Sequence, residues 1–225
     1  MSTNIKIKQL EILLNDFELI SKTVLTQLQI TSKLLEDNSI SELYEEVREN
    51  EIIIDRLEMK IREEVVFTIF TFNPLASDLR RIIAYQDITT NLERVADVLL
   101  NIVNFLKDSD LNNPLVVEFK KEFLKMMGIV HEMIRDSLIS FSIQDSLLAY
   151  KIIKEDKKVN QIFFKINSNL QEVFSDRTLS REDIGNLLTI NAINQNLERI
   201  GDSATNIAEA TVYLTEGKDI RHKIK

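Results

Sequence analysis

Two pairs of carboxylates stand four residues apart at matching places in the two halves of the chain. Glu93 and Asp97 form one pair, and Glu198 and Asp202 form the other, 105 positions later. On a helix, side chains at i and i+4 lie on one face about 6 Å apart, so each pair places two like charges side by side and mildly destabilises an isolated helix. Carboxylate oxygens are the ligands that hard cations prefer. Cation binding is therefore the chemistry that these residues offer.

A longer polar stripe surrounds each pair. At 3.6 residues per turn, the stripe lies opposite the apolar residues of the same segment, which predicts that it faces outward from a helical bundle. Its members all bear oxygen: Gln86, Thr90, Glu93, Asp97 and Asn101 in the first half, and Asn191, Gln195, Glu198, Asp202 and Asn206 in the second. Neither stripe contains Lys or Arg, although an ordinary exposed helix intersperses them. A solvated acidic face and a metal site explain the spacing equally well, and the duplication favours the metal site.

A third pair at the same spacing precedes each stripe. Glu51 and Asp55 stand in the first half, and the residues 105 positions later are Asp156 and Asn160. Both pairs fall in predicted helices, at the edge of the apolar face. If the second and third helices of each half pack side by side, the pairs of that half come together.

The composition limits which ligands and partners the chain can use. The 225 residues include 36 Asp and Glu against 28 Lys and Arg, which disfavours nucleic acid as a partner. There is no Cys and there are two His, so a metal site has to be built from oxygen ligands, which excludes zinc fingers and iron–sulfur clusters. No secretion signal and no apolar run long enough to span a bilayer is found, so we expect a cytoplasmic protein without membrane insertion.

The elements that must position these residues are predicted to be long helices. Apolar residues recur at helical spacing throughout, and the chain has only four Gly and two Pro. Breaks are predicted near residues 37–39, 73–74, 112–114, 142–146 and 175–180. Asn73 and Asn113 each precede a Pro, a pattern typical of an N-cap followed by the first helical residue. Ser180 and Asp183 have the spacing of a capping box.

The chain is internally duplicated. Residues 91–97 read NLERVAD and residues 196–202 read NLERIGD, and the same offset aligns the second and third predicted helices of each half. This predicts an all-α fold of two tandem three-helix bundles, residues 1–110 and 111–225. The first helices of the two halves are only weakly similar, as expected if they contribute packing alone. Gly201 and Ala96 share one repeat position, where a small side chain permits close helix approach.

Residues 198–208, ERIGDSATNIA, resemble the signature E-R-I-G-D-x-A-x-N-I-A of the PhoU family, which lies on the third helix of each of two three-helix bundles. The resemblance extends through essentially the whole chain, although the first copy is degenerate at Val95 and Ala96. It implies that the E(D)-x-x-x-D pairs bind metal clusters on the protein surface, with Fe³⁺ favoured and Mn²⁺, Mg²⁺ or Zn²⁺ as alternatives. The ligands implied are Glu51, Asp55, Glu93, Asp97, Asp156, Glu198 and Asp202. Asn160 stands where the family has an acid, which lowers the charge of the second set.

The same resemblance implies a regulatory function. Members of the family are cytoplasmic, often homodimeric, and damp phosphate-starvation signalling by linking the ATPase subunit of a phosphate ABC transporter to a sensor histidine kinase. We expect no catalysis by this chain. Two alternatives remain from the residues alone. One is a metal-free helical adaptor whose acidic stripes bind a basic partner surface. The other is a metal-dependent hydrolase, which the outward-facing stripes and the lack of a separate general base disfavour.

Overall fold

The computed structural model describes residues 2–176 and 178–220. Six α-helices make up most of this part of the chain, which contains no strand: α1 (Ser2–Glu36), α2 (Ser41–Phe72), α3 (Ala76–Lys107), α4 (Pro114–Ile143), α5 (Ser146–Asp176) and α6 (Arg181–Glu216). The prediction of an all-α fold built from long helices is confirmed, since α2 has 32 residues and α4 has 30. None of the described helices combines the length and the apolar character that a bilayer crossing requires.

Several helix ends follow the predicted capping chemistry. The Asn113 side chain accepts a hydrogen bond from the Leu115 N–H, with Pro114 as the first residue of α4. Ser180 and Asp183 exchange the two hydrogen bonds of a capping box at the start of α6. Gly217 ends α6 with φ +67°, a left-handed conformation that suits a residue without Cβ.

The prediction that Asn73 caps the start of a helix is wrong. Asn73 ends α2 instead, with φ 42° and its N–H donated to the Ile69 carbonyl, and α3 begins only at Ala76. Asn adopts the left-handed conformation more readily than most residues, and a Pro directly after a helix end prevents the helix from continuing. The Asn-Pro pair therefore stops one helix here, whereas at Asn113 it starts one.

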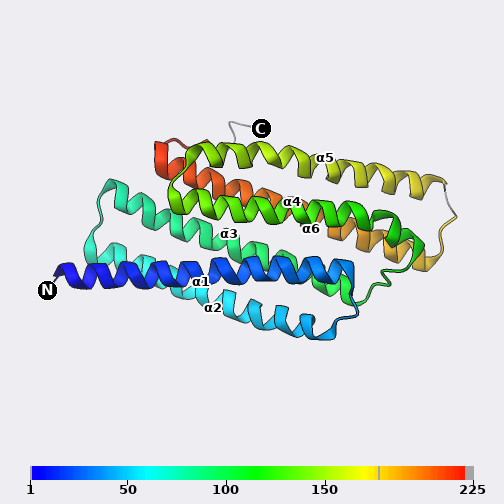
Figure 1. Cartoon of the computed structure of the whole chain (residues 1–225), viewed down its shortest axis with the longest axis horizontal. Coiled ribbons are helices and arrows are strands. Elements are labelled where there is room, and N and C mark those ends of the chain that lie inside the picture. The colour runs from blue at the N-terminus through cyan, green and yellow to red at the C-terminus, as the bar shows by residue number, and fades with distance from the viewer. Residues whose placement is uncertain (1, 177, 221–225) are drawn as a thin grey trace.

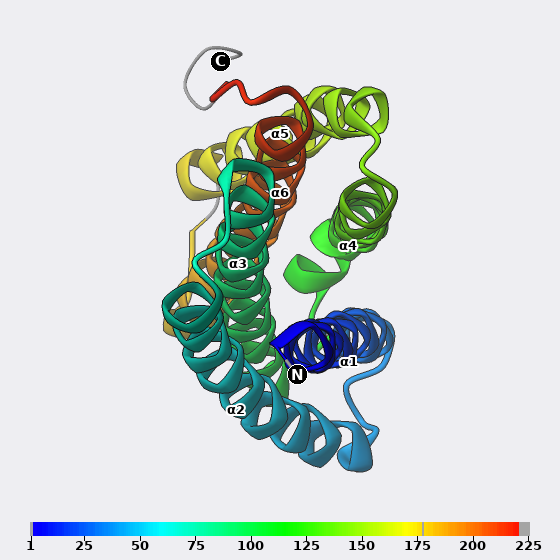
Figure 2. The same ribbon diagram turned by 90° about the vertical axis from the view of Figure 1, so that its left-hand side faces the viewer.

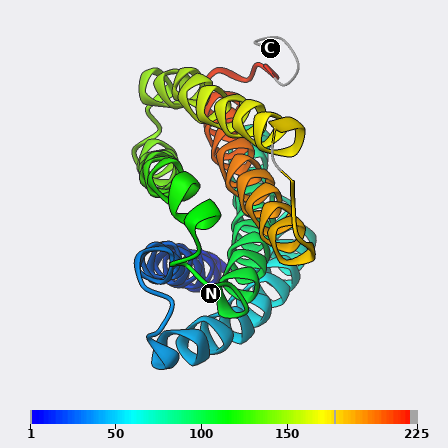
Figure 3. The same cartoon turned by 90° about the vertical axis from the view of Figure 1, so that its right-hand side faces the viewer.

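The helices pack side by side along the length of the molecule (Figure 1). In the end views, α5, α6, α3 and α2 follow one another as a curved layer, and α4 and α1 cover one side of it (Figures 2 and 3). Helices α1–α3 form one bundle and α4–α6 the other, and the chain runs in opposite directions in α3 and α6 (Figure 1). The two bundles meet where α3 packs on α6 and α1 packs on α4. This is the predicted fold of two tandem three-helix bundles.

The bundles share one hydrophobic core rather than two separate ones. The predicted apolar face of α3 is buried as expected, since Ile88, Leu92, Val95 and Leu99 are all inaccessible to solvent. Because α3 packs on α1, α2 and α6, only a narrow strip of its surface remains for polar residues. The polar stripe occupies that strip.

Gly201 lies where α6 passes close to α5. A Cβ added at this position would meet Val159 Cγ1 at 3.1 Å and Asp156 Oδ1 at 3.3 Å, which is tighter than ordinary van der Waals contact. The predicted close approach of helices at this position is confirmed. By contrast, a Cβ added to Gly128 in α4 would meet nothing within 4 Å.

These two glycines respond differently to the same substitution. Ala is favoured over Gly in a helix interior by about 1 kcal/mol, so Gly128→Ala is expected to stabilise the protein by about that amount. In Gly201→Ala, the neighbours have to shift, and we expect overpacking of about 1–3 kcal/mol to cancel or reverse the gain. Urea denaturation of both variants measures the difference, and equal stabilisation would contradict the close packing of α5 on α6.

Candidate metal centre

The polar stripes of α3 and α6 lie on the outer surface, as predicted. Asp97 and Asp202 are exposed, and Glu93 and Glu198 are partly buried, at the same repeat positions. The second stripe also reaches α3 across the bundle interface, because Asn206 in α6 donates a hydrogen bond from Nδ2 to Asn91 Oδ1 in α3 at 3.2 Å. Asn91 is not part of the first stripe, so this bond links the two helices and not the two stripes.

Helices α2 and α3 bring five carboxylates together, which we call the first cluster: Glu51, Asp55 and Glu58 from α2, and Glu93 and Asp97 from α3. This confirms the expectation that the second and third helices unite the pairs of the first half. Glu51 is only 8% exposed, whereas Asp55 and Asp97 are exposed beside it. The cluster therefore runs from the seam between the helices out to solvent.

The protonation of the first cluster reflects its crowding. Burial raises the pKa of Glu51 to about 7; the hydrogen bond from Gln27 acts in the opposite direction, and Asp97 and Asp55 raise the pKa further. Burial also raises the pKa of Glu93, together with the charges of Asp97, Glu58 and Asp55. A cation beside these carboxylates would compensate this repulsion and displace the proton from Glu51.

A side chain from α1 reaches the first cluster. Gln27 is fully buried, and its Nε2 donates to Glu51 Oε2 at 3.2 Å and to the Ala96 carbonyl at 3.1 Å. The other end of the amide, Oε1, is buried without a hydrogen-bond partner in the part of the chain that the structure describes. The expectation that the first helix contributes packing alone is therefore wrong for α1.

Helices α5 and α6 carry the residues at the equivalent repeat positions, which we call the second cluster: Asp156 and Asn160 from α5, and Glu198 and Asp202 from α6. Asn160 donates from Nδ2 to Asp156 Oδ2 at 2.6 Å, so the amide takes up an oxygen that a cation would use. Asp156 also lies against the backbone of α6, since its Oδ1 is 3.3 Å from a Cβ position built on Gly201. The replacement of an acid by Asn160 thus changes the contacts of the cluster as well as its charge.

Sequence reasoning missed one member of the first cluster, Glu58, and the buried residue that contacts the cluster from α1, Gln27. Glu58 is seven residues after Glu51, so it shares a helix face with the predicted pair, and it forms an ion pair with Arg62 at 2.5 Å. Gln27 follows Val24 at helical spacing on the apolar face of α1, where a polar side chain requires a buried partner. Both signals were present in the sequence, but the partner of Gln27 is distant along the chain and was not predictable from spacing.

The donor set of the first cluster fits a hard cation. Its carboxylates are oxygen donors, the kind that Mg²⁺, Mn²⁺ and Fe³⁺ accept. Within residues 2–176 and 178–220, however, no three Asp, Glu or His side chains stand in positions to hold a metal ion. Glu51 and Asp97 already lie within hydrogen-bond distance of each other, and binding would require further carboxylates of the cluster, such as Asp55, to turn toward them. Coordination by the predicted residues stays a prediction.

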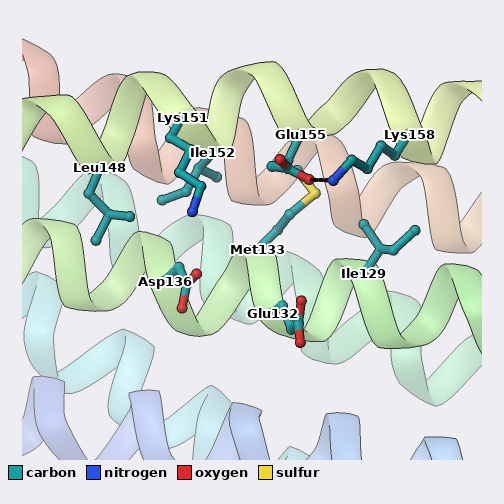
Figure 4. Close-up of a pocket in the computed structure, with 9 residues that line it drawn as sticks. All are labelled: Ile129, Glu132, Met133, Asp136, Leu148, Lys151, Ile152, Glu155 and Lys158. Carbon is teal, nitrogen blue, oxygen red and sulfur yellow. Dashed lines mark ion pairs between the residues drawn. The ribbon is translucent and has the colours of Figure 1, made fainter.

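A cavity of about 240 Å³ between α4 and α5 shows a different charge pattern (Figure 4). Its carboxylates are neighboured by cations: Glu155 pairs with Lys158, and Asp136 accepts from Arg135 at 2.9 Å. In the first cluster, Arg62 pairs with Glu58 and Arg94 lies near Glu93, but the charged groups that act on Glu51 are the carboxylates of Asp97 and Asp55. Among the described residues, the negative charge around Glu51 is therefore not balanced by a paired cation.

The fold and the two clusters together define the class of protein. It is a helical-bundle protein with an internal duplication, and each repeat has carboxylates on its second and third helices, α2 and α3 or α5 and α6. A family model described as the PhoU domain matches residues 17–106 and, a second time, residues 123–211. The chain therefore belongs to the PhoU family, and the two matches coincide with the two repeats.

Individual relatives agree with this assignment. The chain is 32% identical to the phosphate-specific transport system accessory protein PhoU homolog of Clostridium acetobutylicum over 75% of each chain. It is also 32% identical to the homolog of Aquifex aeolicus, over 81% of this chain and 80% of the relative. The crystal structure of PhoU from Pseudomonas aeruginosa superposes with a TM-score of 0.83 at 28% identity, covering 94% of this chain and 99% of that one.

Proposed function

We propose that this protein is a metal-binding cytoplasmic regulator of phosphate uptake and phosphate-starvation signalling. The observation that carries the proposal is the likeness of both repeats to accessory proteins of the phosphate-specific transport system. The partners proposed are the ATPase subunit of a phosphate ABC transporter and a sensor histidine kinase, which the protein contacts as a homodimer. No catalytic step is assigned to it.

The two clusters suit a regulatory role because they lie on the surface. A cation bound there would neutralise part of the carboxylate charge and change the electrostatic character of the face that a partner meets. It would also stabilise the folded state in proportion to its affinity. The residues of this chain would hold the cation through Glu51, Asp55, Glu93 and Asp97 in the first cluster, and through Asp156, Glu198 and Asp202 in the second.

Deleting the gene tests the proposed function. We expect deletion to raise phosphate-responsive gene expression in phosphate-rich medium and to change phosphate uptake, and the wild-type gene to restore both. Unchanged uptake and expression in the deletion strain would overturn the regulatory proposal. Complementation with Glu93→Gln, Asp97→Asn, Glu198→Gln and Asp202→Asn combined then shows whether the carboxylates are needed.

One observation favours a metal-free adaptor as the second candidate. Among the described residues no three carboxylate or imidazole groups are in position for a metal, while both stripes are open to a basic partner surface. Binding of a transporter ATPase that survives chelation, but is lost when Glu93 and Asp97 become Gln and Asn, would support the adaptor. Loss of binding on chelation would support the metal-dependent regulator.

A further inference from the structure

The two clusters differ in how their innermost carboxylate is held. Glu51 receives a hydrogen bond at 3.2 Å from Gln27, a fully buried side chain of another helix. Asp156, at the equivalent repeat position, receives a hydrogen bond at 2.6 Å from Asn160 on its own helix. The first arrangement fixes a carboxylate in the seam between α1, α2 and α3, and the second uses up a carboxylate oxygen within α5.

Gln27 is itself fixed at two points. The same Nε2 that donates to Glu51 also donates to the Ala96 carbonyl of α3 at 3.1 Å, so the amide joins α1, α2 and α3. Its buried Oε1 has no described hydrogen-bond partner. An unpaired buried amide oxygen is costly, and native proteins retain such groups where they serve a purpose. The other end of the same amide serves such a purpose, because Nε2 donates a hydrogen bond to Glu51. An outer-shell hydrogen bond of this kind fixes the orientation of a ligating carboxylate.

We infer that Gln27 is a positioning residue of the first cluster, and that it gives this cluster a higher affinity for divalent or trivalent cations than the second. The inference rests on the metal binding in the proposed function. Gln27 holds Glu51 in the seam by donating to its Oε2, so that the carboxyl group also faces Asp97, which lies within hydrogen-bond distance. The second cluster has Asn160 in place of a ligand and is the weaker one.

The test is a titration of the metal-free full-length protein with Mn²⁺ alone, followed through the electron paramagnetic resonance signal of free Mn²⁺. Wild type is expected to show two classes of sites. The class lost in the Glu93→Gln, Asp97→Asn variant belongs to the first cluster, and the class lost in Asp202→Asn belongs to the second. Gln27→Met keeps the size of the side chain but removes the hydrogen bonds, and outer-shell changes of this kind weaken metal binding about 10- to 100-fold.

We expect Gln27→Met to weaken the tighter class at least about tenfold and to leave the weaker class unchanged. Gln29→Met is the matched control, since it makes the same change at an exposed position of α1. A role in folding alone would lower the melting temperature and leave both classes unchanged or weaken them in parallel, and either result would overturn the inference while metal binding stood. Two equal classes in wild type would overturn the difference in affinity. A wild-type protein that binds no Mn²⁺ would overturn metal binding and this inference together.

Discussion

The Glu51→Gln variant is expected to be more stable than wild type above pH 7 when metal is absent, and to bind cations more weakly at the first cluster. Glu51 is 8% exposed, and burial raises its pKa from the ordinary value of 4.5 to about 7, with Asp97 and Asp55 adding to the effect. Between these pH values the folded state holds a proton that the unfolded chain has released. Stability therefore falls as the pH rises through this window, and the full loss is present above pH 7.

Substitution of Glu51 by Gln removes the charge, so the variant does not undergo this loss of folding stability. We expect a gain of about 1–2 kcal/mol at pH 8, less than the full linkage value because water and salt screen the neighbouring charges. At pH 5, wild type and variant should differ little, since Glu51 is then protonated in the folded state. Urea denaturation in the presence of chelator at the two pH values measures both quantities.

Asp55→Asn provides the control for Glu51→Gln. Asp55 belongs to the same i,i+4 pair but is exposed, so the same removal of charge should change stability by less than about 0.5 kcal/mol. A Glu51→Gln variant that is less stable than wild type at pH 8 would show that the ionised carboxylate stabilises the metal-free fold. The interpretation that the carboxylates of the first cluster repel one another until a cation binds would then be wrong.

The Asn160→Asp variant should increase cation binding at the second cluster at least about tenfold, while it destabilises the metal-free protein by about 1 kcal/mol. The Asn160 amide now donates to Asp156 at 2.6 Å, and the substitution replaces this donor with a second negative charge. The metal-free fold loses a hydrogen bond and gains a like-charge pair at i,i+4. In return the second cluster gains a carboxylate ligand at the position that Asp55 holds in the first.

Mn²⁺ titration and urea denaturation in chelator measure these two opposing effects. Gln161→Glu is a suitable control, because it adds the same charge at the neighbouring, exposed position of α5, about 100° around the helix. It should leave both the affinity and the stability near wild type. If Asn160→Asp and Gln161→Glu increased Mn²⁺ binding equally, nonspecific attraction to an acidic surface would explain the gain.

Much of the fold followed from local patterns in the sequence. The spacing of Ile88, Leu92, Val95 and Leu99 predicted a buried helix face because helical periodicity alone determines which side chains share a side. The 105-residue repeat predicted two bundles because similar sequences adopt similar local structures. The break at Asn73-Pro74 was predicted as the start of a helix, but it is the end of α2. The same dipeptide suits both helix ends, and only the surrounding packing selects between them.

The site was predictable only in part. The carboxylate pairs on α2 and α3 were identified from i,i+4 spacing, and the structure unites those of the first cluster. The hydrogen bond from Gln27 to Glu51 joins residues from different helices, and such contacts depend on how the helices are rotated and shifted relative to one another. Sequence periodicity indicates the buried face of each helix but not this register. The hydrogen bond between Asn160 and Asp156 follows from spacing, but its geometry required the structure.

Metal binding by the carboxylates of α3 and α6 is the property on which the proposed metal-dependent regulation rests. The most direct test is elemental analysis of protein purified without a metal-affinity tag, comparing wild type with the variant that combines Glu93→Gln, Asp97→Asn, Glu198→Gln and Asp202→Asn. We expect stoichiometric metal in wild type and its loss in the variant, with both proteins folded. A wild-type protein that holds no metal even after reconstitution with Fe³⁺ or Mn²⁺, or a variant that retains the full amount, would contradict it.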